Sequence, residues 1–570
     1  MDSDSSETNL VIVTKKYRFI LFCKLYWRSL VILITPIILL PIAFIGENHA
    51  YPSFYVFLVS AVYWTTDVLH PGVISLVPLA WYSIIGTAET GYISQVYLRN
   101  GLLDCLGIMM IITAVEGSTV HKRVALKLLL VIGCSHYRLS LMLFFSSMFL
   151  SMWMSNAVAC GLMMPLVKAL LQALEKMGII EMYQTVDKGV LKSRRHEMSN
   201  PKPTDFTVFY FLGIAYSCSI GGMATLLGSK TNQIFKASCE SIFPRGPKIE
   251  FPQFTLLSLP GVLVMESLLY VWMNSYFMKA FRTHDVAMQS GLTEEEIRYT
   301  HSLLRNQYRQ LGKITFHDIM VVSMVSLAIA LQIMTSATRF NNNVTGVKGV
   351  YTHLQVSAPS IICVLILFVA PTNLDFLKFF RKSHDAINDP LPTTTSKACL
   401  SWSAVRGNML WSVLFTIGGS CMTFEVLKLS GMCAELGRFL RLFGAWPPAA
   451  LALVVILFCK VFTEFADNSC VVHAMLPEIA RLSVASEVHP HYLMLAATLA
   501  SSLPCHLVTG TPANAMVSQY VHIPPWRMLS AGVGPMVIAS VVPWFTVSIW
   551  SKAVWADVSS YPPWAREHII

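Results

Sequence analysis

Two short segments far apart in the chain carry the same spacing of small polar residues. Residues 151–157 read Ser-Met-Trp-Met-Ser-Asn-Ala, and residues 463–469 read Thr-Glu-Phe-Ala-Asp-Asn-Ser. In both, a hydroxyl residue lies five positions and an aromatic residue three positions before the asparagine, and a Met-x-Pro triplet ends nine positions after it. Hydroxyl and amide groups supply donors and acceptors without a fixed charge, so both segments suit the binding of a small ion or a polar ligand.

A second polar element follows each copy. Residues 228–232 read Gly-Ser-Lys-Thr-Asn, and residues 510–514 read Gly-Thr-Pro-Ala-Asn. Where such an element interrupts a helix, the second half presents free N–H groups and a positive dipole end, which suit a carboxylate, while unwound carbonyls suit Na⁺. Small polar residues also hold neighbouring helices together. Four elements in matching order favour a secondary transporter built from internal repeats over that structural role.

The composition is that of a membrane protein. Of the 570 residues, 54% are hydrophobic and only 13% are charged, against about 25% charged in soluble proteins. The net charge of +10 comes from basic residues gathered in certain loops, which is typical of cytoplasmic loops and does not indicate nucleic acid. The 13 cysteines show no C-x-x-C or Cys/His metal spacing and are interpreted as small core residues. We find no enzyme motif.

The polar elements lie inside apolar stretches long enough to cross a bilayer. Eleven transmembrane helices are expected at 29–47, 53–68, 71–87, 102–118, 208–240, 255–280, 317–336, 356–372, 407–427, 492–520 and 527–550. The spans 208–240 and 492–520 are broken at the Gly-containing elements. Two further stretches, 139–172 and 447–482, are interrupted at the Asn segments and predict re-entrant helical hairpins, because irregular backbone at membrane depth must face protein or a wet cavity. The expected fold class is an all-α polytopic membrane protein with an inverted repeat.

These elements divide the chain into six regions, in which each repeat contributes scaffold spans and a transport region. They are a cytoplasmic N-terminal segment (1–28), the scaffold spans of the first repeat (29–118), its transport region with a polar loop at 173–205 (119–240), scaffold spans and connecting loops (241–446), the transport region of the second repeat (447–524), and the last span with the C-terminus (525–570).

The distribution of Lys and Arg predicts the orientation. Basic clusters precede the first span and follow the fourth span, the first hairpin and the eighth span. All four face the cytoplasm if the N-terminus is cytoplasmic and the C-terminus extracellular. The loop 337–355 then lies outside, and it contains Asn343-Val-Thr, a glycosylation sequon.

The motifs resemble those of the divalent anion–sodium symporter family of di- and tricarboxylate carriers, in particular its animal branch. Residues 221–232, Gly-Gly-Met-Ala-Thr-Leu-Leu-Gly-Ser-Lys-Thr-Asn, are similar to the family's Gly-Gly-x-Ala-Thr-x-x-Gly-Thr-x-x-Asn. Residues 510–514 are similar to its Gly-Thr-Pro-Pro-Asn, and 151–153 and 463–465 to its hairpin arms. The resemblance covers nearly the whole chain from about residue 25.

The resemblance implies an elevator-type carrier of citrate, succinate and similar carboxylates in the plasma membrane, and a homodimer. No cofactor is implied other than sodium ions, and the implied partners are small-molecule carboxylates, the lipid bilayer and a second copy of the chain, without nucleic acid. The positions that match carboxylate contacts are Ser155, Asn156, Ser229, Asn468, Ser469, Thr511 and Pro512. The positions that match sodium sites are Ser151, Ser155, Asn156 and Gly228 for the first, and Thr463, Asn468 and Gly510 for the second.

Three residues depart from the family's motifs. Ala157 and Asp467 stand where the hairpin tips of the family carry Thr and Ser, and Lys230 stands where a small residue is usual. An ionisable group at membrane depth is functional by default. Lys230 could replace a sodium ion, pair with the substrate, pair with Asp467 or reach toward an interface; Asp467 could equally pair elsewhere. We therefore expect these two charges to modulate binding and sodium coupling to be weak or absent.

The altered hairpin tips leave a second hypothesis open. A membrane sensor or receptor could keep this fold and bind a carboxylate without transporting it. Uptake into liposomes separates the two, because binding without uptake indicates a sensor.

Overall fold

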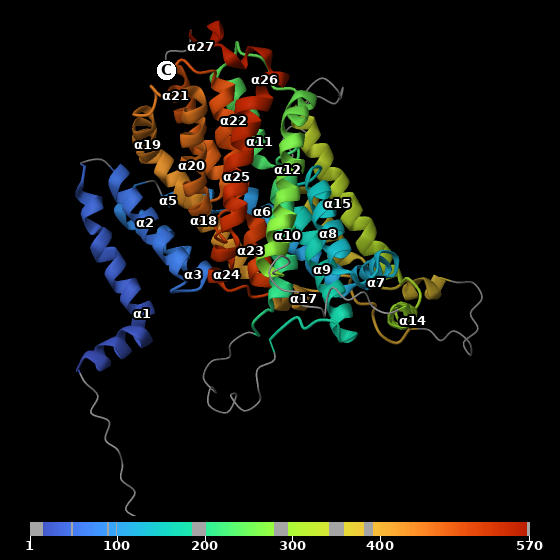
Figure 1. The fold of residues 1–570 in the computed structure, drawn as a ribbon. Helices are drawn as coiled ribbons and strands as arrows, with labels where there is room; N and C mark the ends of the chain where they lie inside the picture. The colour runs from blue at the N-terminus through green and yellow to red at the C-terminus, as the bar shows by residue number, and fades with distance from the viewer. Residues whose placement is uncertain are drawn as a thin grey trace, which may run out of the picture.

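The computed structural model describes residues 15–46, 49–87, 90–98, 100–184, 201–278, 294–340, 358–380 and 392–566, and Asn343 lies outside them. Within these ranges the chain is helical and forms no strand beyond two isolated bridges (Figure 1). Eight helical segments are long and apolar enough to cross a membrane: Lys16–Phe44, Gly91–Gly117, Asn156–Lys176, Phe251–Phe277, Phe316–Thr335, Trp411–Leu429, Pro448–Phe465 and Val533–Val554. The chain is therefore a polytopic, all-α membrane protein.

Six of the eight segments coincide with spans expected from the sequence, and the other two are arms of the expected hairpins. The remaining expected spans correspond to shorter or divided helices. Residues 53–68 fall in α2 (Ala50–Thr66), 71–87 in α3 and α4 (Pro71–Ile74 and Leu76–Ile85), and 356–372 in α16 (Ala358–Val369). The total of eleven spans thus remains a prediction.

Both expected hairpins are pairs of helices separated by a short break. In the first, α8 (His136–Ser151) ends before the tip and α9 (Asn156–Lys176) begins at the asparagine. In the second, α20 (Pro448–Phe465) and α21 (Asn468–Ala485) are arranged in the same way. Each asparagine of the repeated motif is therefore the first residue of a helix.

The two broken helices also divide at the predicted elements. Helix α10 (Asp205–Gly222) is followed by α11 (Lys230–Ile242), and α22 (Pro490–Ser501) by α23 (Pro512–Tyr520). The hydroxyl residue of each element caps the second half, because Ser229 accepts a hydrogen bond from the Thr231 amide and Thr511 from the Asn514 amide.

The asparagine that ends each element holds the break in place. The side chain of Asn232 donates to the carbonyls of Gly222 and Thr225, and that of Asn514 donates to the carbonyl of Pro504. These carbonyls lie at helix ends or in the unwound segment, where no intrahelical donor reaches them. The Gly-x-x-x-Asn element thus supplies the hydrogen bonds that stabilise the break in its own helix.

The helices pack in two groups. Helix α18 (Trp411–Leu429) packs against α2, α3, α4, α5 (Thr90–Tyr97) and α6 (Asn100–Gly117); we call α2–α6 and α18 the flanking helices. The hairpins and broken helices pack with α12 (Phe251–Phe277) and α25 (Val533–Phe545); we call α8–α12, α20–α23 and α25 the hairpin bundle. The two groups meet along α18 and α21 and along α6 and α9.

The remaining helices lie around these groups. They are α1 (Lys15–Leu39), α7 (Val120–Ile132), α14 (Glu294–Gln310), α15 (Phe316–Phe340), α17 (Trp402–Asn408), α19 (Met432–Arg441), α24 (Pro525–Ala531), α26 (Ser551–Val554), α27 (Pro563–Arg566), and the short helices Leu40–Phe44, Asp375–Phe380, Thr546–Trp550 and Ala556–Ser559.

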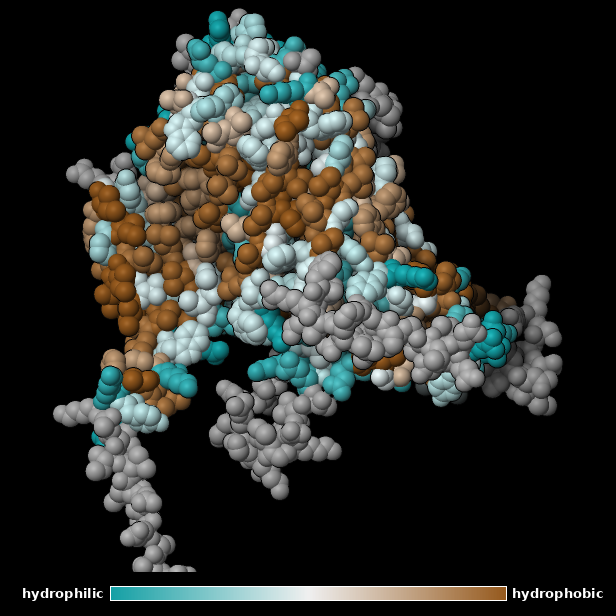
Figure 2. Space-filling model, viewed as in Figure 1, coloured by the Kyte–Doolittle hydropathy of each residue, from teal (hydrophilic) through white to brown (hydrophobic). Residues whose placement is uncertain are grey.

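On the face drawn in Figure 2, a broad apolar band lies between polar ends. Helix α1 stands at the edge of the molecule, and its apolar side chains, such as Phe19, Leu33 and Ile37, are exposed. A contiguous apolar surface of this size is costly in water and suits contact with lipid.

Candidate functional site

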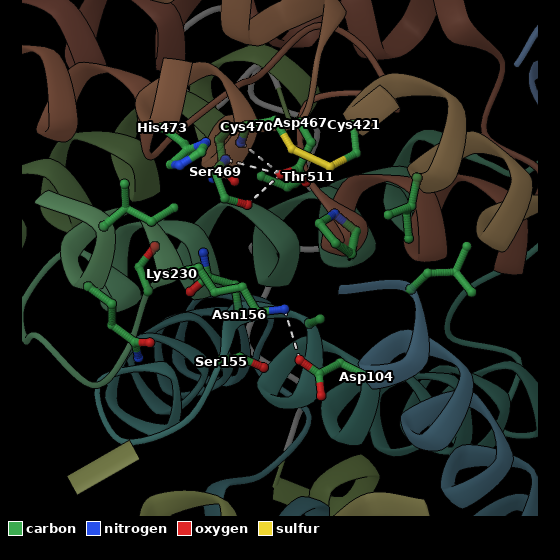
Figure 3. A pocket seen from close by; sticks show the side chains of 18 of the residues that line it. Asp104, Ser155, Asn156, Lys230, Cys421, Asp467, Ser469, Cys470, His473 and Thr511 are labelled. Carbon is green, nitrogen blue, oxygen red and sulfur yellow. Dashed lines mark hydrogen bonds and ion pairs between the residues drawn. A yellow bond between two sulfur atoms is a disulfide. The ribbon is translucent and has the colours of Figure 1, made fainter. Parts of the chain in front are cut away.

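Four helix N-termini meet at one cavity, whose volume is about 530 Å³ (Figure 3). The helices are α9, α11, α21 and α23, one from each of the four polar elements. Residues that line the cavity include Asp104, Cys105, Ser155, Asn156, Gly228, Ser229, Lys230, Cys421, Glu425, Asp467, Asn468, Ser469, Cys470, His473, Thr511 and Pro512. The first turn of each helix carries a positive partial charge, so together the four N-termini favour an anion.

All seven residues expected to contact a carboxylate line this cavity: Ser155, Asn156, Ser229, Asn468, Ser469, Thr511 and Pro512. Of the positions matched to sodium sites, Ser155, Asn156, Gly228 and Asn468 line it as well. Ser151, Thr463 and Gly510 are buried and are not among its lining residues. The structure thus brings the sequence-derived residues together, and their roles remain predictions.

The first hairpin tip packs closely on the first broken helix. The hydroxyl of Ser151 lies 3.0 Å from the side-chain amide of Asn156. A Cβ atom at Gly228 would stand 2.6 Å from the Ser151 carbonyl oxygen. Only glycine therefore permits this approach. The side-chain nitrogen of Asn156 is placed to donate to the Ser151 hydroxyl (3.0 Å) and to the Gly228 carbonyl (3.2 Å), so hydroxyl and carbonyl oxygens gather around this amide group.

The second tip repeats this contact. A Cβ atom at Gly510 would stand 2.6 Å from the Thr463 carbonyl oxygen, and the backbone amide of Asn468 donates to the Gly510 carbonyl at 3.0 Å. Oxygen-rich clusters of this kind suit hard cations such as Na⁺. The hydroxyl and carbonyl oxygens beside each tip would thus be the ligands of a small cation, and at the first tip they also accept hydrogen bonds from the Asn156 amide.

Lys230 forms an ion pair that the sequence did not indicate. Its Nζ atom lies 2.8 Å from Oδ2 of Asp104, whose side chain is only 6% exposed. Asp104 belongs to α6 of the flanking helices, whereas Lys230 begins α11 of the hairpin bundle, so the pair spans the two groups. No ion pair joins Lys230 to Asp467 among the described residues. The sequence did not indicate Asp104, because it lies 126 positions from Lys230 and outside every motif.

Asp467 acts as the N-cap of α21. Its Oδ1 atom accepts hydrogen bonds from the backbone amides of Ser469 (3.1 Å) and Cys470 (3.4 Å) and from the Ser469 hydroxyl. A carboxylate at this position is stabilised by the helix dipole. Asp467 therefore brings a negative charge to the cavity that α21 itself holds in place.

A disulfide bond links Cys421 of α18 to Cys470 of α21, with Cα atoms 5.7 Å apart. Interpreting all the cysteines as isolated core residues was therefore wrong for these two. The bond joins the flanking helices to the hairpin bundle at the cavity wall. Spacing in the sequence gave no signal for it, because the two residues lie 49 positions apart on different helices.

A group of three polar side chains also lies at this wall. The Nδ1 atom of His473 lies 3.1 Å from Oε1 of Glu425, and the ammonium group of Lys428 lies 3.3 Å from the same ring nitrogen. His473 is thus a cavity residue with polar partners.

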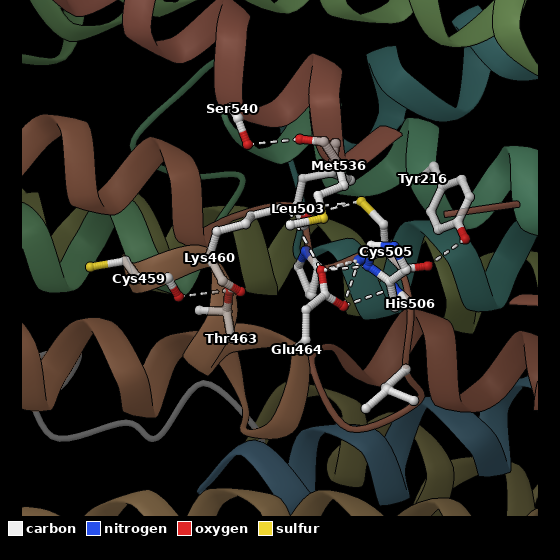
Figure 4. A network of polar contacts seen from close by, with 12 residues as sticks. Tyr216, Cys459, Lys460, Thr463, Glu464, Leu503, Cys505, His506, Met536 and Ser540 are labelled. Atoms are coloured by element: carbon white, nitrogen blue, oxygen red, sulfur yellow. Dashed lines mark hydrogen bonds and ion pairs between the residues drawn. The ribbon is translucent and has the colours of Figure 1, made fainter. Parts of the chain in front are cut away.

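A buried polar network supports the second broken helix (Figure 4). The Glu464 carboxylate accepts from the backbone amides of Cys505 (3.0 Å) and His506 (2.8 Å) and lies 3.9 Å from the Lys460 ammonium group. The ammonium group of Lys460 donates to the Leu503 carbonyl. This network satisfies the backbone between α22 and α23 and fixes it to the hairpin arm α20, so it positions the tip without lining the cavity.

Comparison with known proteins identifies the family. A model described as the sodium:sulfate symporter transmembrane region matches residues 23–556. The chain belongs to this family. The match confirms the resemblance drawn from the motifs.

Three relatives align over almost their full lengths. The chain is 31% identical to Protein I'm not dead yet of Drosophila melanogaster, over 95% of this chain and 91% of the relative. It is 24% identical to the Na(+)/citrate cotransporter of Rattus norvegicus (95% and 97% covered) and 25% identical to the human Na(+)/dicarboxylate cotransporter 3 (94% of each). The last two relatives are named for cotransport, which agrees with the lack of an enzyme motif.

Proposed function

We propose that the protein is a secondary transporter of di- and tricarboxylates, such as citrate and succinate, in the plasma membrane. The observation that carries this proposal is the convergence of four helix N-termini on one cavity of about 530 Å³. That volume lies within the range of small-molecule sites. Two of the relatives are named for citrate and dicarboxylate, and an anion with separated carboxylates can reach more than one N-terminus at once.

The proposed movement is that of an elevator, in which the hairpin bundle slides past the flanking helices. Its support is the division of the fold into two groups, with the binding residues on the bundle. The proposal includes eleven spans, two re-entrant hairpins, a homodimer, a cytoplasmic N-terminus and an extracellular C-terminus. A glycan at Asn343 would mark the outer side.

Sodium would be held by the two clusters behind the hairpin tips. Ser151, Ser155, Asn156 and Gly228 would form the first, and Thr463, Asn468 and Gly510 would form the second. Bound sodium would add positive charge beside the carboxylate. In this chain Lys230 already supplies a fixed cation two residues after Gly228, and we therefore propose that sodium coupling is weak.

The test is uptake of labelled citrate and succinate into proteoliposomes. Asn156→Ala and Asn468→Ala should each lower uptake by roughly tenfold or more, because a hydrogen bond to a charged group contributes about 1.5–3 kcal/mol. Asn408→Ala, at the exposed end of α17, is the matched control and should leave uptake unchanged. Normal uptake in both cavity variants would refute the assignment.

One observation favours the alternative of a non-transporting sensor. The Cys421–Cys470 bond and the Lys230–Asp104 pair both tie the bundle to the flanking helices. A receptor could keep such ties permanently. Saturable citrate binding without uptake, under both oxidising and reducing conditions, would support the sensor.

A further inference from the structure

The cavity wall carries a cluster of metal-ligand atoms outside the two sodium sites. The sulfur atoms of Cys421 and Cys470 and a carboxylate oxygen of Asp467 all lie within 4.8 Å of one another. All three residues line the cavity, and Figure 3 shows the disulfide beside Asp467 and Ser469. Once the S–S bond is broken and the two sulfurs have separated, two sulfurs and one oxygen could contact one ion at the same time.

The surroundings orient the carboxylate for such a role. Its Oδ1 atom is held by the hydroxyl of Ser469 and by two backbone amides, and no hydrogen bond from the described part of the chain reaches Oδ2. Groups that fix a ligating carboxylate through hydrogen bonds raise the affinity of metal sites. Ser469 therefore has a place in the cluster as a positioning residue.

The two sulfurs bind no metal strongly while they are joined to one another, since the thiolate is the ligand form of cysteine. Reduction by a small thiol of the glutathione type breaks the S–S bond. The disulfide takes up two electrons and two protons and becomes two thiols, while two molecules of the small thiol become one disulfide. Metal binding then displaces the two thiol protons into solvent.

We propose that the reduced Cys421–Asp467–Cys470 cluster binds a soft divalent cation of the Zn²⁺ class at the wall of the substrate cavity. Thiolates select such ions over Na⁺, Mg²⁺ and Ca²⁺. Three protein ligands leave the fourth tetrahedral position open. That position faces the cavity and is available to water or to a carboxylate of the transported anion.

The site has two exclusive states. In the oxidised state a covalent bond joins α18 to α21, and in the reduced state a cation can join the same helices by coordination. The metal site itself requires no transport, whereas its effect on uptake rests on the proposed function. Zn²⁺ should therefore inhibit the reduced carrier by holding the bundle against the flanking helices.

The experiment measures Cd²⁺ and Zn²⁺ binding to the purified full-length protein. The protein is reduced with dithiothreitol and desalted without oxygen, and thiolate-to-Cd²⁺ charge-transfer absorption and proton release are recorded during titration. We expect one cation per chain in the reduced wild type and none at this site after reoxidation. Cys105→Ser is the matched control, because Cys105 lines the same cavity outside the cluster, and it should bind like wild type.

Three variants test the ligands separately. Cys470→Ser should lose the charge-transfer band of this site, and Asp467→Asn, which keeps both thiols, should weaken binding. Ser469→Ala should weaken binding by roughly 10- to 100-fold if it orients the carboxylate. Size-exclusion profiles and melting temperatures in detergent show that each variant is folded. Undiminished Cd²⁺ binding in Cys470→Ser, or no binding by reduced wild type that still binds citrate, would overturn the proposal.

Because these titrations involve no transport, they succeed or fail independently of carboxylate uptake. If Zn²⁺ inhibits uptake only after reduction, and does not inhibit Cys470→Ser, then binding at this site blocks the transport cycle. Equal inhibition of that variant would place the inhibiting metal elsewhere and contradict this extension.

Discussion

At the scale of single residues, Lys230, Asp104 and Asp467 bring charged groups to the cavity, and each is held there by different contacts. Asp467 is held by its own helix as an N-cap. Lys230 is held by Asp104 from another helix group at 2.8 Å. An incoming carboxylate would compete with Asp104 for the Lys230 ammonium group. The ion pair therefore gives Lys230 a partner in the absence of substrate and prevents an isolated charge at membrane depth.

Breaking this pair should destabilise the protein. Lys230→Met leaves the Asp104 carboxylate without its partner, which for a fully buried pair costs about 3–5 kcal/mol. The Lys230 side chain is 37% exposed, so solvent screening reduces the expected cost to about 1–3 kcal/mol. We expect a lower melting temperature in detergent for Lys230→Met.

The double variant Lys230→Met/Asp104→Leu should recover most of that loss, because it removes both charges. Equal destabilisation by the single and double variants would show that the pair contributes nothing. Lys236→Met serves as the control, since Lys236 pairs with Glu240 within α11 and not across the groups.

At the scale of elements, the paired interruptions determine where the site lies. The motifs predicted each break, because Gly, a hydroxyl cap and a side-chain amide act locally within a few residues. Asp104 and the Cys421–Cys470 bond could not be predicted in this way. Both are contacts between helices distant in sequence, and they depend on how the two groups pack.

Gly228→Ala and Gly510→Ala should each abolish carboxylate binding. An added Cβ would stand 2.6 Å from the Ser151 or Thr463 carbonyl oxygen, so the hairpin tip must move away from the broken helix. Gly91→Ala in α5 is the matched control, because a Cβ there meets nothing within 4 Å, and it should bind normally. Isothermal titration with citrate measures the effect, and wild-type affinity in the first two variants would contradict the close contact.

The disulfide between α18 and α21 should slow transport, since it joins groups that are proposed to slide. In metal-free buffer, reduction should raise citrate uptake by the wild type severalfold. Cys421→Ser should transport at the higher rate with or without reductant. Uptake in Cys421→Ser that equals that of the oxidised wild type would show that the bond does not restrain the cycle.

At the scale of the whole molecule, surface and cavity complement each other. The exposed residues of the apolar band and of α1 suit lipid, and the polar residues of the four interrupted elements gather inside around the cavity. The family match over residues 23–556 extends this organisation to nearly the whole chain. We expect this chain to depend less on sodium than the relatives that are named as Na(+) cotransporters.

Uptake of citrate should therefore persist when choline replaces sodium. Two like charges 4 Å apart repel by about 4 kcal/mol at an effective dielectric of 20, and about 4.1 kcal/mol corresponds to millimolar affinity. The repulsion from a Lys230 charge near the first cluster is thus enough to offset the binding free energy of a weak sodium site. The triple variant Lys230→Gly/Asp467→Ser/Ala157→Thr should acquire sodium dependence, and collapse of wild-type uptake in choline would refute the idea.

The placement of Lys230 and Asp467 on the bundle, with Asp104 on a flanking helix, also bears on the response to membrane voltage. Under the proposed movement the first two charges travel and Asp104 stays. When both are ionised, their charges cancel, so the empty bundle returns without moving their net charge through the electric field. Each net negative charge on the cargo changes the energy of the loaded step by about 2.3 kcal/mol per 100 mV. The current carried in each cycle is then set by the ionisation of the carboxylate, and a negative cell interior favours its exit.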